Sequence, residues 1–200
     1  MSQKHGADTA PPSRRSVVKG AAWAVPAVVV AGAAPTVAAS AGFLTLNGNA
    51  CKLPGNSQSI YKGYVFEAIS NNVTGPLPRD AIVEITSVTV AGSPDLGAYK
   101  VVLPGGAQSC SCSCGTLDIN HVYCSPDGSV NQRVLIYTSA DVTGNSANST
   151  VTITYRIYDC AGGSVCPSTS TSAKTEASLG GTPPVQGPCT IVGAQQNIPA

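Results

Sequence analysis

The fold is decided by the stretch Ser149-Thr150-Val151-Thr152-Ile153-Thr154-Tyr155-Arg156-Ile157-Tyr158. Apolar or aromatic residues occupy alternate positions from Val151 to Ile157, and threonine or arginine stands between them. Successive side chains of a β-strand point to opposite faces of the sheet, so this alternation predicts one buried face and one solvated face. The stretch therefore predicts a sheet that covers a hydrophobic core on one side.

Further runs of β-branched and aromatic residues predict additional strands. They are residues 43–46, 60–70, 81–91, 98–103, 117–123 and 132–139. The segments between them are rich in Gly, Pro, Asn and Asp, which accept the backbone angles of turns. No segment after residue 40 has the pattern of an amphipathic helix. This organisation predicts an all-β fold, namely an antiparallel β-sandwich that is immunoglobulin-like in general architecture and stapled by disulfides.

One short motif resembles a feature of true immunoglobulin domains. Tyr158-Asp159-Cys160 matches the Tyr-x-Cys of immunoglobulin strand F. The single tryptophan of the chain, Trp23, lies outside the predicted domain, so the usual core partner of that cysteine is missing. We therefore interpret the motif as a coincidence.

Composition argues against nucleic-acid binding. Charged residues make up 10% of the chain, whereas roughly 25% is usual in soluble domains. Past Ala41 there are seven basic and nine acidic residues, which leaves a net charge of −2. Phosphate neutralisation needs clustered lysine and arginine, and these scattered cations form no basic face.

The N-terminal segment, residues 1–41, is called the leader here. It carries the motif Ser13-Arg14-Arg15-Ser16-Val17-Val18-Lys19, followed by an uncharged run from Gly20 to about Ala39. A charged segment, an apolar segment and small exit residues, in that order, are typical of a signal peptide. Proline interrupts the apolar run, which is rich in alanine and glycine, whereas a membrane span needs about 20 strongly apolar residues. The pattern favours a cleaved signal over a permanent membrane anchor.

The pair Arg14-Arg15 and its neighbours resemble the consensus of twin-arginine (Tat) signal peptides. The segment from Ala22 to Pro26 gives the leader a further likeness to those of secreted actinobacterial proteins. The resemblance covers the leader alone. It implies export of a folded protein to the medium or the cell surface, with the Tat translocase and signal peptidase as partners during export.

Three regions are predicted along the chain. Residues 1–41 form the signal peptide, and small residues permit cleavage after Ala39 or Ala41. Residues 42–166 form the β-sandwich domain. Residues 167–200 form a tail rich in Ser, Thr, Gly and Pro, a composition typical of a linker. Cys189 is expected to tie this tail back to the domain.

The eight cysteines all follow the leader, and an even number in a short exported domain predicts a disulfide framework. They are Cys51, Cys110, Cys112, Cys114, Cys124, Cys160, Cys166 and Cys189. In an extended segment, the three cysteines at 110, 112 and 114 share one face and cannot conveniently bridge one another. We expect four disulfides, no free thiol and no bound metal, with the cluster reaching outward to segments such as those of Cys124, Cys160 and Cys166. The connectivity stays open.

The residue types of the domain are compatible with three candidate chemistries. Cys124 or a serine, His121 and an aspartate could form a hydrolase site, although no recognisable nucleophile motif surrounds them. Asp80 and Glu84 could act as a glycosidase pair. The thiols from Cys110 to Cys124, with His121, could bind Zn or Cu(I), although Cys-x-Cys spacing differs from that of ordinary zinc sites.

The sequence assigns no catalytic, cofactor or metal residue. We expect a secreted or cell-envelope-associated, non-enzymatic protein that binds a protein or the cell wall or serves a structural role. The alternatives are a metal-binding or thiol-redox protein using the Cys110–Cys124 cluster and a small hydrolase using His121. Several tyrosines could supply contact area for a partner; they include Tyr61, Tyr64, Tyr123, Tyr137 and Tyr158.

Overall fold

A computed structural model describes residues 43–53, 59–73, 79–91, 96–141, 149–180 and 189–200. The predicted signal peptide, with Arg14, Arg15 and both cleavage sites, lies outside these residues. The strands are β1 (Leu44–Lys52), β2 (Tyr64–Ser70), β3 (Ala81–Val90), β4 (Tyr99–Val102), β5 (Val122–Ser125), β6 (Gln132–Thr138), β7 (Thr150–Asp159) and β8 (Thr171–Ser178). One short 3₁₀ helix, η1 (Cys160–Gly162), follows β7.

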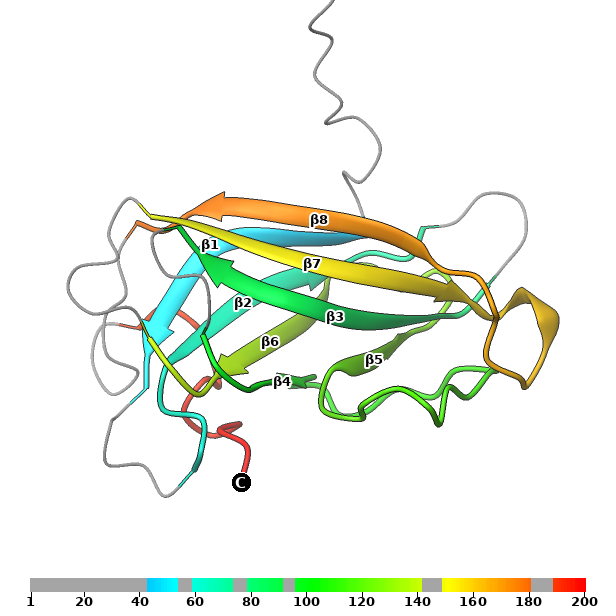
Figure 1. The fold of residues 1–200 in the computed structure, drawn as a ribbon, viewed down its shortest axis with the longest axis horizontal. Helices are drawn as coiled ribbons and strands as arrows, with labels where there is room; N and C mark the ends of the chain where they lie inside the picture. Colours follow the sequence, from blue (N-terminus) through cyan, green and yellow to red (C-terminus); the bar gives the residue numbers. More distant parts are fainter. Residues whose placement is uncertain (1–42, 54–58, 74–78, 92–95, 142–148, 181–188) are drawn as a thin grey trace, which may run out of the picture. The chain divides into compact units, whose positions relative to one another are not determined.

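The strands form two antiparallel four-stranded sheets, with orders β1-β2-β6-β4 and β5-β3-β7-β8 (Figure 1). If β5 is set aside, the remaining seven strands follow the immunoglobulin constant-type orders ABED and CFG. The extra strand β5 extends the second sheet beyond β3. The expected all-β, antiparallel, immunoglobulin-like sandwich is confirmed.

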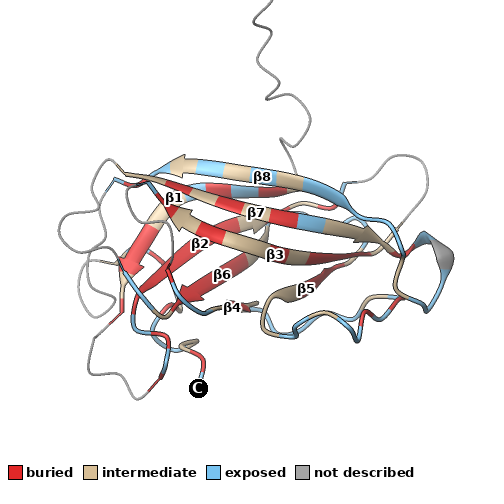
Figure 2. Cartoon of the chain, viewed as in Figure 1, coloured by how far each residue is buried: buried red, intermediate tan, exposed pale blue. Residues whose placement is uncertain are grey.

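The main core lies between the two sheets. In β7, Val151, Ile153 and Tyr155 are buried, and the intervening threonines are half-buried. The core combines them with residues of the opposite sheet such as Phe66 and Ile136. Figure 2 shows that both sheets carry buried positions along their strands. The alternation that predicted β7 therefore reflects burial, because every second side chain of this strand packs in the core away from water.

The outer face of the first sheet is also covered. Val65 on β2 and Leu135 on β6 point away from the main core and are fully buried. They pack in a second cluster with Ile191 and Ala194 of the C-terminal segment, residues 189–200. The disulfide Cys51–Cys189 joins this segment to β1. The expectation that Cys189 ties the tail back is confirmed.

A third cluster covers part of the outer face of the second sheet. It contains Ile82 of β3 together with cysteines of the loop between β4 and β5. The four disulfides are Cys51–Cys189, Cys110–Cys124, Cys112–Cys160 and Cys114–Cys166. The three clustered cysteines thus reach outward to separate segments, as expected from their shared face.

Strand β8 corrects the predicted domain boundary. The composition of residues 171–178 predicts part of a linker-like tail, but these residues pair with β7 along eight residues. Ala173, Thr175 and Ala177 alternate with exposed polar residues, and an edge strand needs only such small side chains on its inner face. The backbone ladder with β7 supplies the pairing, which composition does not reveal. The sandwich therefore extends beyond residue 166.

Three strand boundaries also differ from expectation. Strand β1 continues to Lys52 through an irregularity between Leu46 and Ala50, where Gly48 adopts a positive φ of 80°. Strand β2 begins at Tyr64, four residues later than predicted. Residues 117–121 form turns, because Asp118 accepts hydrogen bonds from the backbone of Asn120 and His121, and β5 begins only at Val122.

The disulfide partner of Cys160 bears on the interpretation of the Tyr-x-Cys motif. Tyr158-Asp159-Cys160 lies at the end of β7, and Cys160 bonds to Cys112 in the loop between β4 and β5. The immunoglobulin disulfide joins strands B and F across the core. Cys160 therefore does not form the immunoglobulin disulfide, although β7 stands at the position of strand F in the strand order.

The disulfides lie outside the main core, which contains no cysteine among its described residues. We predict that the double variant Cys51→Ala/Cys189→Ala keeps its far-UV circular dichroism spectrum but loses up to about 5 kcal/mol of unfolding free energy, because this disulfide closes a long loop. The linked residues are 138 apart in sequence, whereas Cys110 and Cys124 are 14 apart.

Urea unfolding and amide hydrogen exchange measure both effects. The matched control, Cys110→Ala/Cys124→Ala, should lose about 3 kcal/mol and leave exchange in the C-terminal segment unchanged. Unchanged protection of residues 191–197 in the first variant would contradict a role for Cys51–Cys189 in holding this segment.

Candidate functional site

An open groove of about 650 Å³ lies beside β4 and β5, the strands at matching edges of the two sheets. The loop between these strands forms its opposite wall. Its lining is mainly aliphatic and disulfide-rich. The lining includes Lys100, Val101, Leu103, Leu117, Ile119 and Val122.

Three disulfides fix the wall of the groove. Cys110–Cys124 attaches the loop to β5, while Cys112–Cys160 and Cys114–Cys166 attach it to the segment after β7. An isolated bridge between Ser113 and Val165 adds backbone contact there. The concave surface is therefore preformed, which is typical of ligand-binding sites.

Asp80 fixes the same loop by polar contacts. Its carboxylate accepts hydrogen bonds from the backbone N–H groups of Asp127 and Ser111, at 3.1 and 2.8 Å. These bonds favour the ionised form and hold the pKa of Asp80 below its ordinary value. Glu84, the other proposed glycosidase carboxylate, accepts a 2.9 Å hydrogen bond from the Tyr158 hydroxyl. Both carboxylates thus serve the scaffold.

His121 lies next to the groove in a structural setting. Its ring stacks on Tyr99, with centroids 4.0 Å apart, and its Nε2 lies 3.8 Å from Asp118. Tyr99 donates a 2.9 Å hydrogen bond to the carbonyl of Ile85, and burial raises the pKa of Tyr99 to about 12. Cys124 is bound to Cys110, so its sulfur is not a free nucleophile.

The cysteine cluster has no thiolate to offer a metal in this structure. All its sulfur atoms are in disulfides, and no described cysteine is free. No described group of three or more His, Cys, Asp or Glu side chains is arranged to hold a metal ion. The tyrosines expected to supply contact area also serve another purpose, since Tyr61, Tyr64, Tyr123 and Tyr137 are buried.

Comparison of the chain with protein-family models, curated proteins and solved structures finds no match. The groove is therefore identified from its geometry. Sequence analysis missed it, because β4 and β5 lie in different sheets and only the fold brings them together. One signal was present: Leu117 and Ile119 interrupt a polar turn, and Ile119 is 84% exposed.

Among the described residues, no helix is long and apolar enough to cross a membrane.

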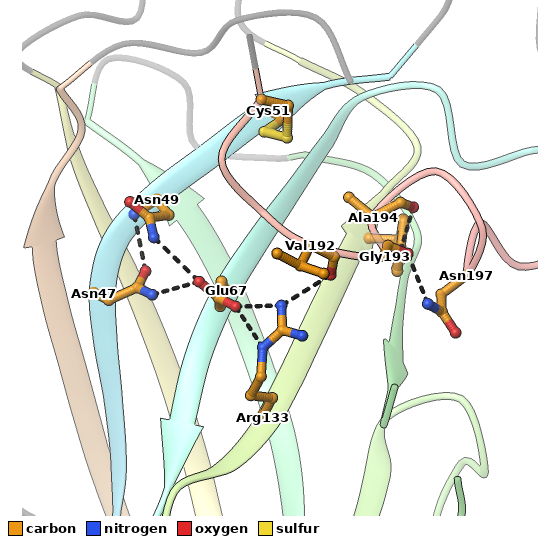
Figure 3. A network of polar contacts seen from close by, with 11 residues as sticks. Asn47, Asn49, Cys51, Glu67, Arg133, Val192, Gly193, Ala194 and Asn197 are labelled. Atoms are coloured by element: carbon orange, nitrogen blue, oxygen red, sulfur yellow. Dashed lines mark hydrogen bonds and ion pairs between the residues drawn. A yellow bond between two sulfur atoms is a disulfide. The ribbon is translucent and has the colours of Figure 1, made fainter. Parts of the chain in front are cut away.

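A second polar arrangement surrounds Glu67 on the outer face of the first sheet (Figure 3). Glu67 is 7% exposed and accepts hydrogen bonds from Asn47 and Asn49, at 2.6 and 3.1 Å. Arg133 pairs with its other oxygen at 2.7 Å through Nε and donates at 2.9 Å to the carbonyl of Val192. This network joins β1, β2 and β6 to the C-terminal segment.

Opposing effects set the pKa of Glu67. Burial alone would raise it, but hydrogen bonds from Asn49, Asn47 and Arg133 and the charge of Arg133 outweigh burial and lower it. Tyr137 donates a 2.6 Å hydrogen bond from its hydroxyl to the carbonyl of Ala194 nearby. The arrangement therefore stabilises the C-terminal segment on the outer face of the first sheet. No sequence motif predicted it.

We predict that Glu67→Gln lowers the free energy of unfolding at pH 7 by about 1 to 3 kcal/mol, because it removes a buried acceptor of charge-assisted hydrogen bonds. The depressed pKa makes the ionised carboxylate stabilising above its ordinary pKa of 4.5, and this stabilisation is lost as pH falls through the folded-state pKa. The difference in unfolding free energy between wild type and variant should therefore be constant at neutral pH and decrease below pH 4.5.

Urea unfolding over this pH range measures the gap. Glu176→Gln is the control, since Glu176 pairs with Lys174 on the exposed strand β8. It should change stability by about 0.5 kcal/mol or less. An equal loss in both variants would contradict the assignment of Glu67 as a buried organising charge.

Proposed function

We propose that this chain is an exported, non-enzymatic binding protein whose binding site is the groove beside β4 and β5. The observation that carries the proposal is the preformed, mainly aliphatic concavity, whose wall is held in place by three disulfides. A rigid concave site spares the binding reaction the cost of ordering a loop. His121 and the cysteine cluster belong to this framework, and the proposal gives them no catalytic or metal-binding role.

The destination follows from cysteine chemistry and from the leader. Four disulfides indicate an oxidising, exported environment, because reducing systems keep cytosolic thiols free. The finer proposal is the Tat route to the medium or the cell surface. It is supported by the resemblance of Arg14-Arg15 and the following mild apolar run to twin-arginine leaders.

We predict that replacing Arg14 and Arg15 together by lysine traps the precursor inside the cell, because lysine keeps the charge but not the guanidinium pair that the leader presents. Immunoblots of cells and medium measure the distribution. The control Lys4→Gln removes a cation of the same leader outside the motif and should be secreted normally. Undiminished secretion of the double arginine variant would contradict the Tat assignment.

We predict that a photo-reactive amino acid in place of Ile119 forms a discrete cross-linked adduct on irradiated producing cells, because this side chain lines the groove. Val73, which is 75% exposed and does not line the groove, is the matched control position. Mass spectrometry of the purified adducts identifies the partner. Absence of an adduct at 119, or equal adducts at both positions, would contradict groove binding.

A further inference from the structure

We infer that the ligand of the groove is an extended aliphatic peptide segment with a negative charge, which adds as a strand to the open edge of β5. This inference rests on the proposed function and names its ligand class. Its basis is the backbone of the two edge strands, the aliphatic lining and the one charge in that lining.

The open edge of β5 follows from its pairing with β3. The N–H of Ile85 donates to the carbonyl of His121 at 2.8 Å, so these opposite residues form a hydrogen-bonded pair. Such pairs alternate with non-bonded pairs in an antiparallel ladder, and the register opposes Glu84 to Val122 and Ile82 to Cys124. Val122 and Cys124 therefore direct their backbone groups away from β3.

A side-chain contact confirms this direction. The carbonyl of Cys124 accepts a 3.0 Å hydrogen bond from Nε2 of Gln132, which lies outside the β3 ladder. The N–H and carbonyl of Val122 and the N–H of Cys124 have no hydrogen-bond partner among the described residues. Both residues line the groove. An incoming strand would supply the missing partners, as in other peptide complexes formed by strand addition.

Strand β4, which also lines the groove, has a similar edge. The N–H of Ser139 donates to the carbonyl of Ala98 at 2.8 Å, so Tyr99 and Val101 direct their backbone groups away from β6 by the same alternation. The N–H of Val101 is used by the carbonyl of Asn120 at 2.7 Å. The carbonyl of Val101 has no partner among the described residues, so it offers a further acceptor at the groove.

The side chains favour an aliphatic peptide. Leu103, Leu117 and Ile119 line the groove beside the open edge of β5. Every second side chain of an added strand would face this lining, while the others face solvent. The aromatic residue in the lining, Tyr123, is buried, so the groove offers no exposed ring for a sugar to stack on. Strand addition uses both the backbone and the aliphatic surface.

The positive charge of Lys100 favours a ligand with a negative charge. Lys100 is the one charged residue in the groove lining, and no carboxylate among the described residues pairs with it. A peptide with an acidic residue or a free C-terminal carboxylate complements this charge. The inferred ligand is therefore aliphatic at alternate positions and anionic at one end.

The probe is a short synthetic peptide of alternating valine and threonine with a free C-terminal carboxylate, added to the purified mature chain. Nuclear magnetic resonance should detect slowing of amide hydrogen exchange at Val122 and Cys124 by at least about tenfold, because these N–H groups become hydrogen-bonded. Tyr123, whose N–H already faces β3, should change little. Unchanged exchange at Val122 and Cys124 under saturating peptide would overturn strand addition.

Matched controls separate the contributions. Two control peptides, N-methylated on the odd or on the even residues, keep the side chains. The one whose methyl groups face β5 cannot approach the strand edge and should not slow exchange, whereas the other should. Ile119→Asp should weaken binding at least about tenfold, the loss expected when a charge replaces an aliphatic contact, whereas Val73→Asp should not. Lys100→Gln and amidation of the peptide carboxylate should each weaken binding several-fold, and their effects should not add if the two groups interact.

The outcomes distinguish this inference from the wider proposal. A cross-link from position 119 to a glycan or lipid would overturn the peptide ligand and leave groove binding in place. A cross-link to a protein segment, with slowed exchange at Val122 and Cys124, would support both. Absence of a cross-link and of any peptide effect would overturn both.

Discussion

Burial of the central strands β2 and β6 on both faces is the constraint on which the rest of this structure depends. Phe66 and Ile136 face the core between the sheets, while Val65 and Leu135 face outward and would otherwise meet water. A two-layer sandwich buries only one face of each sheet. The C-terminal segment therefore has to cover the other face, and Cys51–Cys189, Arg133 and Tyr137 hold it there.

The disulfides stabilise these covers and leave the central core to hydrophobic packing. The main cluster contains no cysteine among its described residues, whereas seven of the eight cysteines lie in or against the two outer clusters. The eighth, Cys124, is bonded to Cys110 beside the third cluster. This division fits the proposed export of a folded chain. Under that proposal, the sandwich would assemble with reduced thiols, and the disulfides of the outer clusters would form at the oxidising destination.

The groove is a by-product of the same arrangement. The loop after β4 crosses to the second sheet to deliver its cysteines, and in doing so it leaves a concave surface beside β4 and β5. The loop closes neither strand's open edge completely, since the backbone groups of Val122 stay without a described partner. Exposed strand edges are normally protected in native proteins. An edge kept open inside a rigid aliphatic groove therefore suits the addition of a partner strand.

The sequence by itself determined the all-β class, the position of β7, most other strands and the need for a disulfide framework, because each depends on local alternation or on residue counts. It also placed Cys110, Cys112 and Cys114 on one face. Only the tertiary structure decided the connectivity, the role of β8 and the groove. Strand β8 has the composition of a linker and is a strand because β7 offers it a ladder. The pairing of Glu67 with Arg133 and the approach of β4 to β5 join residues far apart in the chain, and no local pattern specifies such contacts.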